Sequence, residues 1–139
     1  VNRPGGVSGS VSINGNNLEL TVVGSGYSTW ATANAGGQDP DGDFDNDGVS
    51  NGVEYFLGQT GSTFTANPGL VGGTVTWTNG GNIASSAYGP EFVVQTSTNL
   101  VSWTDVLAAD PNLNNIAGSV SYTPTGVGKQ FVRLKVTPN

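Results

Sequence analysis

The chain begins with two short segments in which apolar residues alternate with small or polar ones. Residues 7–13 alternate valine or isoleucine with serine and glycine, and residues 18–23 read Leu-Glu-Leu-Thr-Val-Val. Residues 14–17, Asn-Gly-Asn-Asn, lie between them and strongly favour a turn. The pattern predicts a β-hairpin. Because two strands alone are marginally stable in water, we expect it to pack on the rest of the chain, on a preceding repeat or on a neighbouring molecule.

The next periodic segments are typical of short helices. Residues 27–35 contain a candidate N-cap, Ser28, and three alanines, and they are followed by two glycines. Residues 50–57 predict a second helix that ends at Gly58. Both are too short to be stable alone, so packing must order them. We expect this packing to come from five apolar side chains: Trp30, Phe44, Val53, Phe56 and Leu57.

After a connector rich in Gly, Thr, Asn and Pro at 59–73, the pattern is typical of strands. We predict five, near 74–78, 91–97, 102–107, 119–123 and 130–137. In the last, Val132, Leu134 and Val136 share one face, while Phe131, Arg133 and Lys135 share the other.

We therefore expect a mostly β fold, a small β-sandwich that carries a short helix–calcium loop–helix insert. Residues 1–26 would form the hairpin, a candidate pair of assembly strands. Residues 27–60 would form the helical insert and residues 61–139 the sandwich strands, all in one compact unit.

The segment between the two helices carries the clearest chemistry. From Asp43 it fits D-x-[DN]-x-[DN]-G-x5-E, the twelve-residue calcium loop. Gly48 occupies the sixth position, where the chain must turn sharply. The spacing predicts six Ca2+ ligands, which are Asp43, Asp45, Asp47, the Val49 carbonyl, Asn51 and a bidentate Glu54. Asp39 and Asp41 extend the alternation upstream, as candidates for a second ion. The alternative interpretation is a solvated acidic loop or linker.

Composition narrows the classes of function. The net charge of −6 is local, because six of the ten acids lie at 39–54 and the other four balance the four bases. So few bases argue against nucleic-acid binding. The absence of Cys and His excludes thiol nucleophiles, imidazole bases and Cys/His zinc sites. No run of 18 apolar residues is present, so no membrane span is expected. A chain that starts at Val1 suggests either a mature product cut from a longer precursor or a sequence read from native material.

Several strings in the sequence resemble a known bacterial module. They are Tyr27–Trp30, Asp39–Gly58, Phe92–Thr104 and Phe131–Pro138. Together they resemble the C-terminal region of large secreted planctomycete and verrucomicrobial proteins, which often carry autotransporter-associated β-strand repeats. The acidic segment also resembles dockerin and thrombospondin type-three calcium repeats. The resemblance implies an extracellular or cell-surface location and a non-catalytic terminal module. It brings no defined activity, and the single loop argues against a cohesin-type partner, because dockerins pair two loops.

Three functions follow as hypotheses. The first is a calcium-stabilised structural module that self-associates, as a filament or surface-layer subunit, or joins neighbouring domains of a larger extracellular protein. The second is a carbohydrate-binding accessory module, with four aromatic candidates for glycan stacking: Trp77, Trp103, Tyr88 and Tyr122. The alternative for these rings is core packing. The third, an enzyme, is disfavoured because the acids outside the loop show no pairing pattern.

Overall fold

The computed structural model describes residues 8–14, 17–23 and 26–139, and the side chains from residue 26 onward. The described chain is mostly β, with two short α-helices. Its elements are β1 (Ser8–Asn14), β2 (Asn17–Val23), α1 (Gly26–Asn34), α2 (Asn51–Leu57), β3 (Val75–Thr78), the 3-10 turn η1 (Ser85–Ala87), β4 (Phe92–Ser97), β5 (Thr104–Asp105), β6 (Leu113–Ile116), β7 (Ser119–Tyr122) and β8 (Phe131–Val136).

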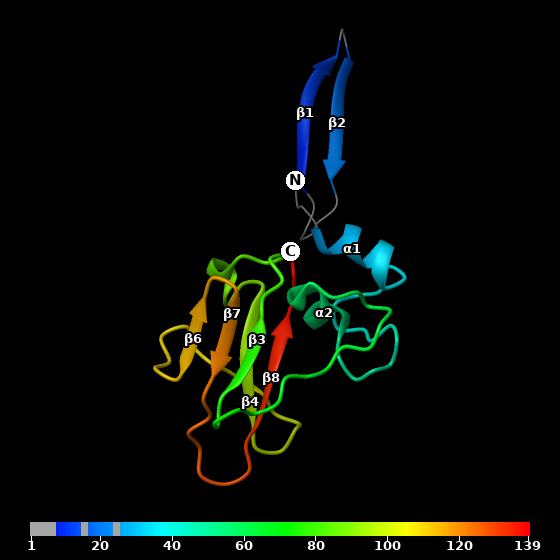
Figure 1. The fold of residues 1–139 in the computed structure, drawn as a ribbon. Helices are drawn as coiled ribbons and strands as arrows, with labels where there is room; N and C mark the ends of the chain where they lie inside the picture. Colours follow the sequence, from blue (N-terminus) through cyan, green and yellow to red (C-terminus); the bar gives the residue numbers. More distant parts are fainter. Residues whose placement is uncertain (1–7, 15–16, 24–25) are drawn as a thin grey trace.

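The strands form three antiparallel sheets, in the orders β1-β2, β3-β7-β6 and β5-β4-β8. The two three-stranded sheets lie together, and both helices lie near the C-terminal end of β8 (Figure 1). The β1–β2 ribbon pairs with neither sheet and extends away from the body of the molecule (Figure 1). The predicted pairing of the two strands is thus confirmed, and their ladder stays separate from the other strands; the centre of the predicted turn, residues 15–16, lies outside the described residues.

One core joins the sheets to the helices. Phe56 of α2 is fully buried, and its ring centroid lies 4.9 Å from that of Phe92 on β4. Val94, Val120 and Trp77 continue this core across both sheets. The regions at 27–60 and 61–139 therefore contribute to the same apolar interior.

The two helices begin and end within one residue of the predicted bounds, but Ser28, the candidate N-cap, lies inside α1, which begins at Gly26. Gly58 ends α2 in the left-handed conformation at φ 71°, and its N–H donates to the Tyr55 carbonyl. Tyr27 and Trp30 of α1 pack against Tyr55 of α2, with all ring centroids within 5.6 Å. The expectation for Phe44 is wrong, because 39% of this residue is exposed and its ring lies over Gly36 instead of joining the core.

Two differences in the strands have physical reasons. The strand predicted at 102–107 forms a ladder only at Thr104–Asp105, because the preceding residues make a turn held by the Ser97 and Asn99 side chains. Strand β6 was missed because its sequence, Leu-Asn-Asn-Ile, has little β propensity. It forms because it pairs with β7 over four residues. The other predicted strands are confirmed to within two residues.

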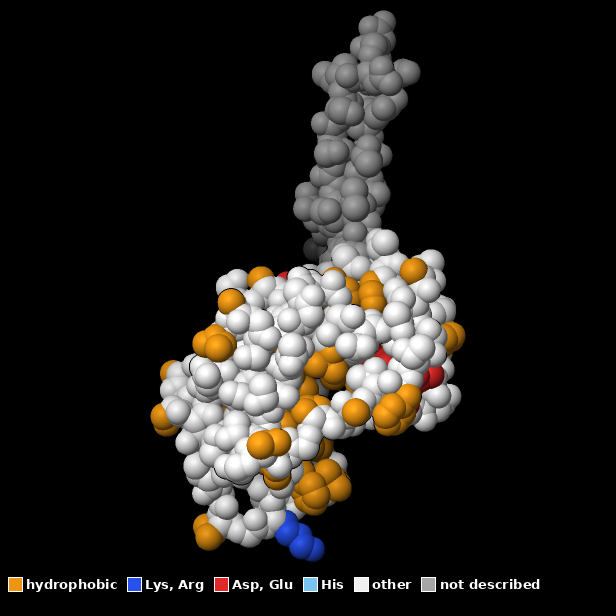
Figure 2. Space-filling view, viewed as in Figure 1, with side chains coloured by type: hydrophobic (Ala, Val, Ile, Leu, Met, Phe, Trp, Pro, Cys, Tyr) orange, Lys and Arg blue, Asp and Glu red, His pale blue; other side chains and the backbone are white. Residues whose placement is uncertain are grey.

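The visible face of the body is poor in charge (Figure 2). In the described part of the chain, no helix is both long and apolar enough to cross a membrane.

Candidate metal centre

Three aspartates converge in the loop between α1 and α2. Asp43, Asp45 and Asp47 each bring one carboxylate oxygen to within 4.8 Å of the others, and all three side chains are half-buried. The chain turns back on itself through Asn46 and Gly48, with φ of 61° and 91°. Positive φ is common for glycine and tolerated by asparagine, so these residues permit the turn that gathers the carboxylates.

Backbone amides hold the aspartates in this arrangement. The Asp47 N–H donates to Oδ1 of both Asp43 and Asp45 at 3.2 Å. The Gly48 N–H donates to Asp43 Oδ2 at 2.9 Å, and the Val49 N–H donates to Asp47 Oδ1 at 2.7 Å. The Val49 carbonyl, also a predicted ligand, accepts no hydrogen bond from a described residue. The loop therefore presents oriented oxygens to one region.

Glu54 lies in the first turn of α2, and its side chain is fully buried. One carboxylate oxygen, Oε1, accepts a hydrogen bond from the Thr65 hydroxyl at 2.9 Å. The other, Oε2, is buried and has no hydrogen-bond partner. A buried acceptor left without a partner costs about 1–3 kcal/mol, and more when it is charged. Glu54 does not belong to the group of carboxylates that lie within 4.8 Å of one another, so it approaches the aspartates from outside their cluster.

The electrostatics of Glu54 reflect its burial and the nearby aspartates. Burial raises the pKa of Glu54 to about 7, against the lowering effect of the Thr65 hydrogen bond. The negative charges of Asp45, Asp47 and Asp43 add to the rise. A cation among these carboxylates would reverse the effect, because it favours their ionised forms.

Thr65 joins the two halves of the site. Its N–H donates to Asp47 Oδ2 at 2.5 Å, while its hydroxyl donates to Glu54. The connector after α2 therefore closes over the acidic loop. Gly61 fits the same closure, because a Cβ at this position would lie 2.9 Å from the Ala35 side chain and 3.2 Å from Glu54 Oε2. Sequence reasoning missed both residues, since nothing in a Gly/Thr-rich connector shows that it returns to the loop.

Asn51, a predicted ligand, is fully buried and fastens the loop to α2. Its Oδ1 accepts from the Phe44 N–H at 3.1 Å, and its Nδ2 donates to the Asp39 carbonyl at 3.2 Å. The side-chain oxygen that would face an ion is thus engaged with the backbone. Asp39 and Asp41, the candidates for a second ion, are exposed and lie outside the aspartate cluster.

The four aromatic candidates for glycan stacking do not form one platform. Trp77 and Tyr122 are core residues, 3% and 6% exposed. Tyr88 is half-buried, and its hydroxyl donates to the Val106 carbonyl at 2.8 Å. Trp103 is half-buried, and the guanidinium carbon of Arg133 lies 4.0 Å from its ring centroid. A row of exposed ring faces, which a glycan-binding surface would use, is not formed by these four residues.

Among the described side chains, three acids outside the segment at 39–54 accept hydrogen bonds from neighbouring groups. Asp105 accepts from the Gln95 amide at 2.6 Å, Asp110 accepts from the Asn112 N–H at 2.8 Å, and Glu91 accepts from the Asn139 amide at 3.1 Å.

Comparison with known proteins gives no match to any family model, to any curated protein or to any solved structure.

Proposed function

We propose that this chain is a calcium-stabilised, non-catalytic extracellular structural module. The observation that carries the proposal is the convergence of three aspartates, which Thr65 links to Glu54, whose buried Oε2 has no hydrogen-bond partner. Hard oxygen donors with a net negative charge suit a hard divalent cation. Ca2+ fits best, because it accepts six to eight oxygens with flexible geometry, whereas Mg2+ requires a near-ideal octahedron.

The residues that would hold Ca2+ are Asp43, Asp45, Asp47, the Val49 carbonyl and Glu54. When bound, the ion supplies positive charge that removes the repulsion among four carboxylates. The protein supplies the positioning: backbone amides orient the aspartates, and Thr65 orients Glu54. Asn51 holds the loop to α2 and leaves its place in the coordination shell to water, as often occurs at the ninth loop position.

The role of the ion is structural because of what the site connects. Glu54 lies one residue from Tyr55, which packs on α1, and two residues from Phe56, which packs on the sheets. The loop, both helices and the connector at 58–65 meet at this point. Calcium binding would therefore be coupled to the folding of this whole region.

The wider role is assembly in an extracellular setting. The two three-stranded sheets, which share one core, fit the layers of a small sandwich. Loops of this kind often saturate at about 0.1–1 mM Ca2+ in extracellular modules, which is the concentration range outside cells. The separate β1–β2 ribbon supports self-association, because a two-stranded ribbon needs a packing partner.

Isothermal titration calorimetry of the calcium-free protein tests the proposal. We expect one Ca2+ per chain, weaker binding of Mg2+, and loss of most of the affinity in Asp45→Asn. Glu91→Gln is the matched control, because it also removes one carboxylate charge but lies outside the loop. Equal Ca2+ affinity in all three proteins, or no binding by the unmodified chain, would contradict the assignment.

A further inference from the structure

Strand β8 has an edge that no other strand of the described chain occupies. In its ladder with β4, the Thr137 N–H donates to the Glu91 carbonyl at 2.7 Å, which fixes the alternation of hydrogen-bonded pairs. By this alternation the peptide groups of Val132 and Leu134 point away from β4. No described residue forms a hydrogen bond with them. The edge therefore offers two N–H and two C=O groups for pairing.

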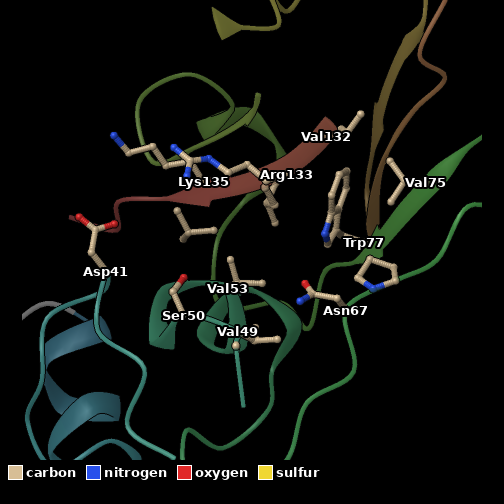
Figure 3. A pocket seen from close by; sticks show the side chains of 14 residues that line it. Asp41, Val49, Ser50, Val53, Asn67, Val75, Trp77, Val132, Arg133 and Lys135 are labelled. Atoms are coloured by element: carbon tan, nitrogen blue, oxygen red, sulfur yellow. The ribbon is translucent and has the colours of Figure 1, made fainter. Parts of the chain in front are cut away.

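This edge borders a hollow. A cavity of about 610 Å³ lies between β8, the edge strand β3 and the start of α2. Figure 3 shows Val53 of α2 and Trp77 of β3 on its walls, with β8 crossing above them. Figure 2 shows a hollow in the body of the molecule with hydrophobic side chains inside it. The cavity is open to solvent, and its lining includes polar residues, Asp41, Ser50 and Asn67, beside the apolar ones.

The connector at 59–73, which borders the cavity, also carries exposed apolar side chains. Asn67 and Pro68 line the opening, and the same connector carries three strongly exposed apolar side chains, Phe64, Leu70 and Val71. Their exposed fractions are 77%, 65% and 82%. Clustered exposed apolar groups are typical of a protein–protein contact, and so is an unpaired strand edge.

The β1–β2 ribbon has the complementary pattern. Its register pairs Val11 with Leu20 and Ile13 with Leu18, so one face of the ribbon carries these apolar positions. The opposite face carries polar positions and one valine: Ser8, Ser10, Ser12, Glu19, Thr21 and Val23. Glu19 is the single charged residue of the two strands.

We infer that the open edge of β8 and the adjoining cavity bind the β1–β2 ribbon of a second copy of this chain. If a ribbon strand pairs with β8, each face of the ribbon continues a face of the β8 sheet with matching chemistry. The apolar ribbon face covers the cavity on the side of Leu134, and Glu19 comes to the side of Arg133 and Lys135. Three of the four bases of the chain lie at 129–135, so the charges are complementary. This inference rests on the proposed assembly function and names its contact.

A second copy fits better than the chain's own ribbon. Only two residues separate β2 from α1, and the ribbon extends away from the body (Figure 1). To reach its own cavity it would have to reverse direction within those two residues. Docking between copies is head-to-tail, because the ribbon of one copy enters the cavity of the next. Such a contact repeats into a filament or closes into a ring.

Cross-linking tests this contact, since the chain contains no cysteine. Two single-cysteine variants of the full chain, Thr21→Cys on the ribbon and Phe131→Cys on β8, are mixed in Ca2+ and treated with a short bis-maleimide. We expect a covalent dimer that forms only in the mixture. Thr21→Cys mixed with Leu107→Cys is the control, because Leu107 is exposed beyond β5 at the far edge of the same sheet. No more dimer than in the control pair would overturn the inference. So would a purely internal cross-link in the Thr21→Cys/Phe131→Cys double variant.

Sedimentation velocity separates this contact from the wider proposal. We expect the unmodified chain to form larger species and Leu20→Asp to stay monomeric while its calorimetric Ca2+ binding is unchanged. Val132→Pro tests the β8 side of the contact, and it should also stay monomeric. Proline removes the Val132 N–H, which the β4–β8 ladder does not use. Assembly without the specific cross-link overturns this contact and leaves the assembly function standing. A monomeric unmodified chain that binds Ca2+ overturns both the contact and assembly but leaves the calcium site. Assembly and cross-linking without Ca2+ binding overturn the calcium site alone.

Discussion

The substitution Glu54→Gln should have opposite effects on stability with and without calcium. Glutamine keeps the size of the side chain and removes its charge. In chelator, the unmodified protein holds a fully buried carboxylate with an unpartnered oxygen beside three aspartates. Relief of that desolvation and repulsion should raise the free energy of unfolding of the variant by about 1–2 kcal/mol.

With calcium the order should reverse. A ligand present at 100 times its dissociation constant stabilises the native state by about 2.7 kcal/mol. For a chain of this size that gain raises the Tm by about 10 °C. The variant lacks the bidentate anionic ligand, so it should retain little of the gain. The unmodified protein should therefore be the less stable of the two in chelator and the more stable in Ca2+.

Thermal unfolding followed by circular dichroism, in EGTA and in 10 mM CaCl2, measures this crossing. Glu91→Gln should respond to Ca2+ like the unmodified protein, because Glu91 bonds only to the Asn139 amide among the described side chains. An equal calcium-induced rise in Tm for Glu54→Gln and the unmodified chain would contradict the role of Glu54 as a ligand. A Glu54→Gln variant that is the less stable protein in EGTA would contradict the cost assigned to the buried carboxylate.

Three further predictions follow from individual contacts. Thr65→Ala should lower Ca2+ affinity several-fold, measured by calorimetry, because Glu54 loses the hydroxyl that orients it, whereas Thr65→Ser should stay close to the unmodified protein. Gly80→Ala should destabilise the fold by about 1–3 kcal/mol in both EGTA and Ca2+, measured by urea unfolding, because a Cβ there would lie 2.5 Å from the Gly58 backbone; a calcium-dependent loss would contradict this reasoning. The four tyrosines should lose their protons at a higher pH than free tyrosine, because burial is the main cause that raises the pKa of each. The pKa of Tyr27 is raised to about 12, and those of Tyr55, Tyr88 and Tyr122 are raised as well. A folded-state pKa above 10.0 favours the protonated form, so this stabilisation is complete below pH 10 and is lost as the pH rises toward 12, and absorbance at 295 nm should rise together with unfolding; a rise centred at pH 10 in folded protein would contradict it.

The parts of the fold with strong local signals could be predicted from the sequence. The hairpin, both helices and the long strands are specified by turn residues, a glycine cap and clear alternation. Strand β6 was not predictable in this way, since it is specified by pairing with β7 and not by its own composition. Phe44 was misplaced for a related reason: a large apolar residue in a loop is buried only if the loop turns it inward.

In the candidate site, too, local spacing identifies some residues and tertiary packing brings in others. The three aspartates could be identified because their spacing reflects the geometry of one continuous loop. Thr65 and Gly61 come from a connector whose path depends on tertiary packing, so no local pattern indicated them. The spacing also assigned Asn51 to the ion, while the structure uses its amide to close the loop onto α2. Spacing identifies which residues are near one another, and the hydrogen bonds decide what each one does.

We expect Glu54 and the three loop aspartates to share one calcium ion. The most direct measurement is an anomalous difference map from crystals grown in CaCl2, with data collected at a wavelength where calcium scatters anomalously. We predict one peak per chain within about 2.3–2.6 Å of oxygens from Asp43, Asp45, Asp47 and Glu54. A map with no peak at the loop, or a peak that the Glu54 carboxylate does not contact, would contradict the claim.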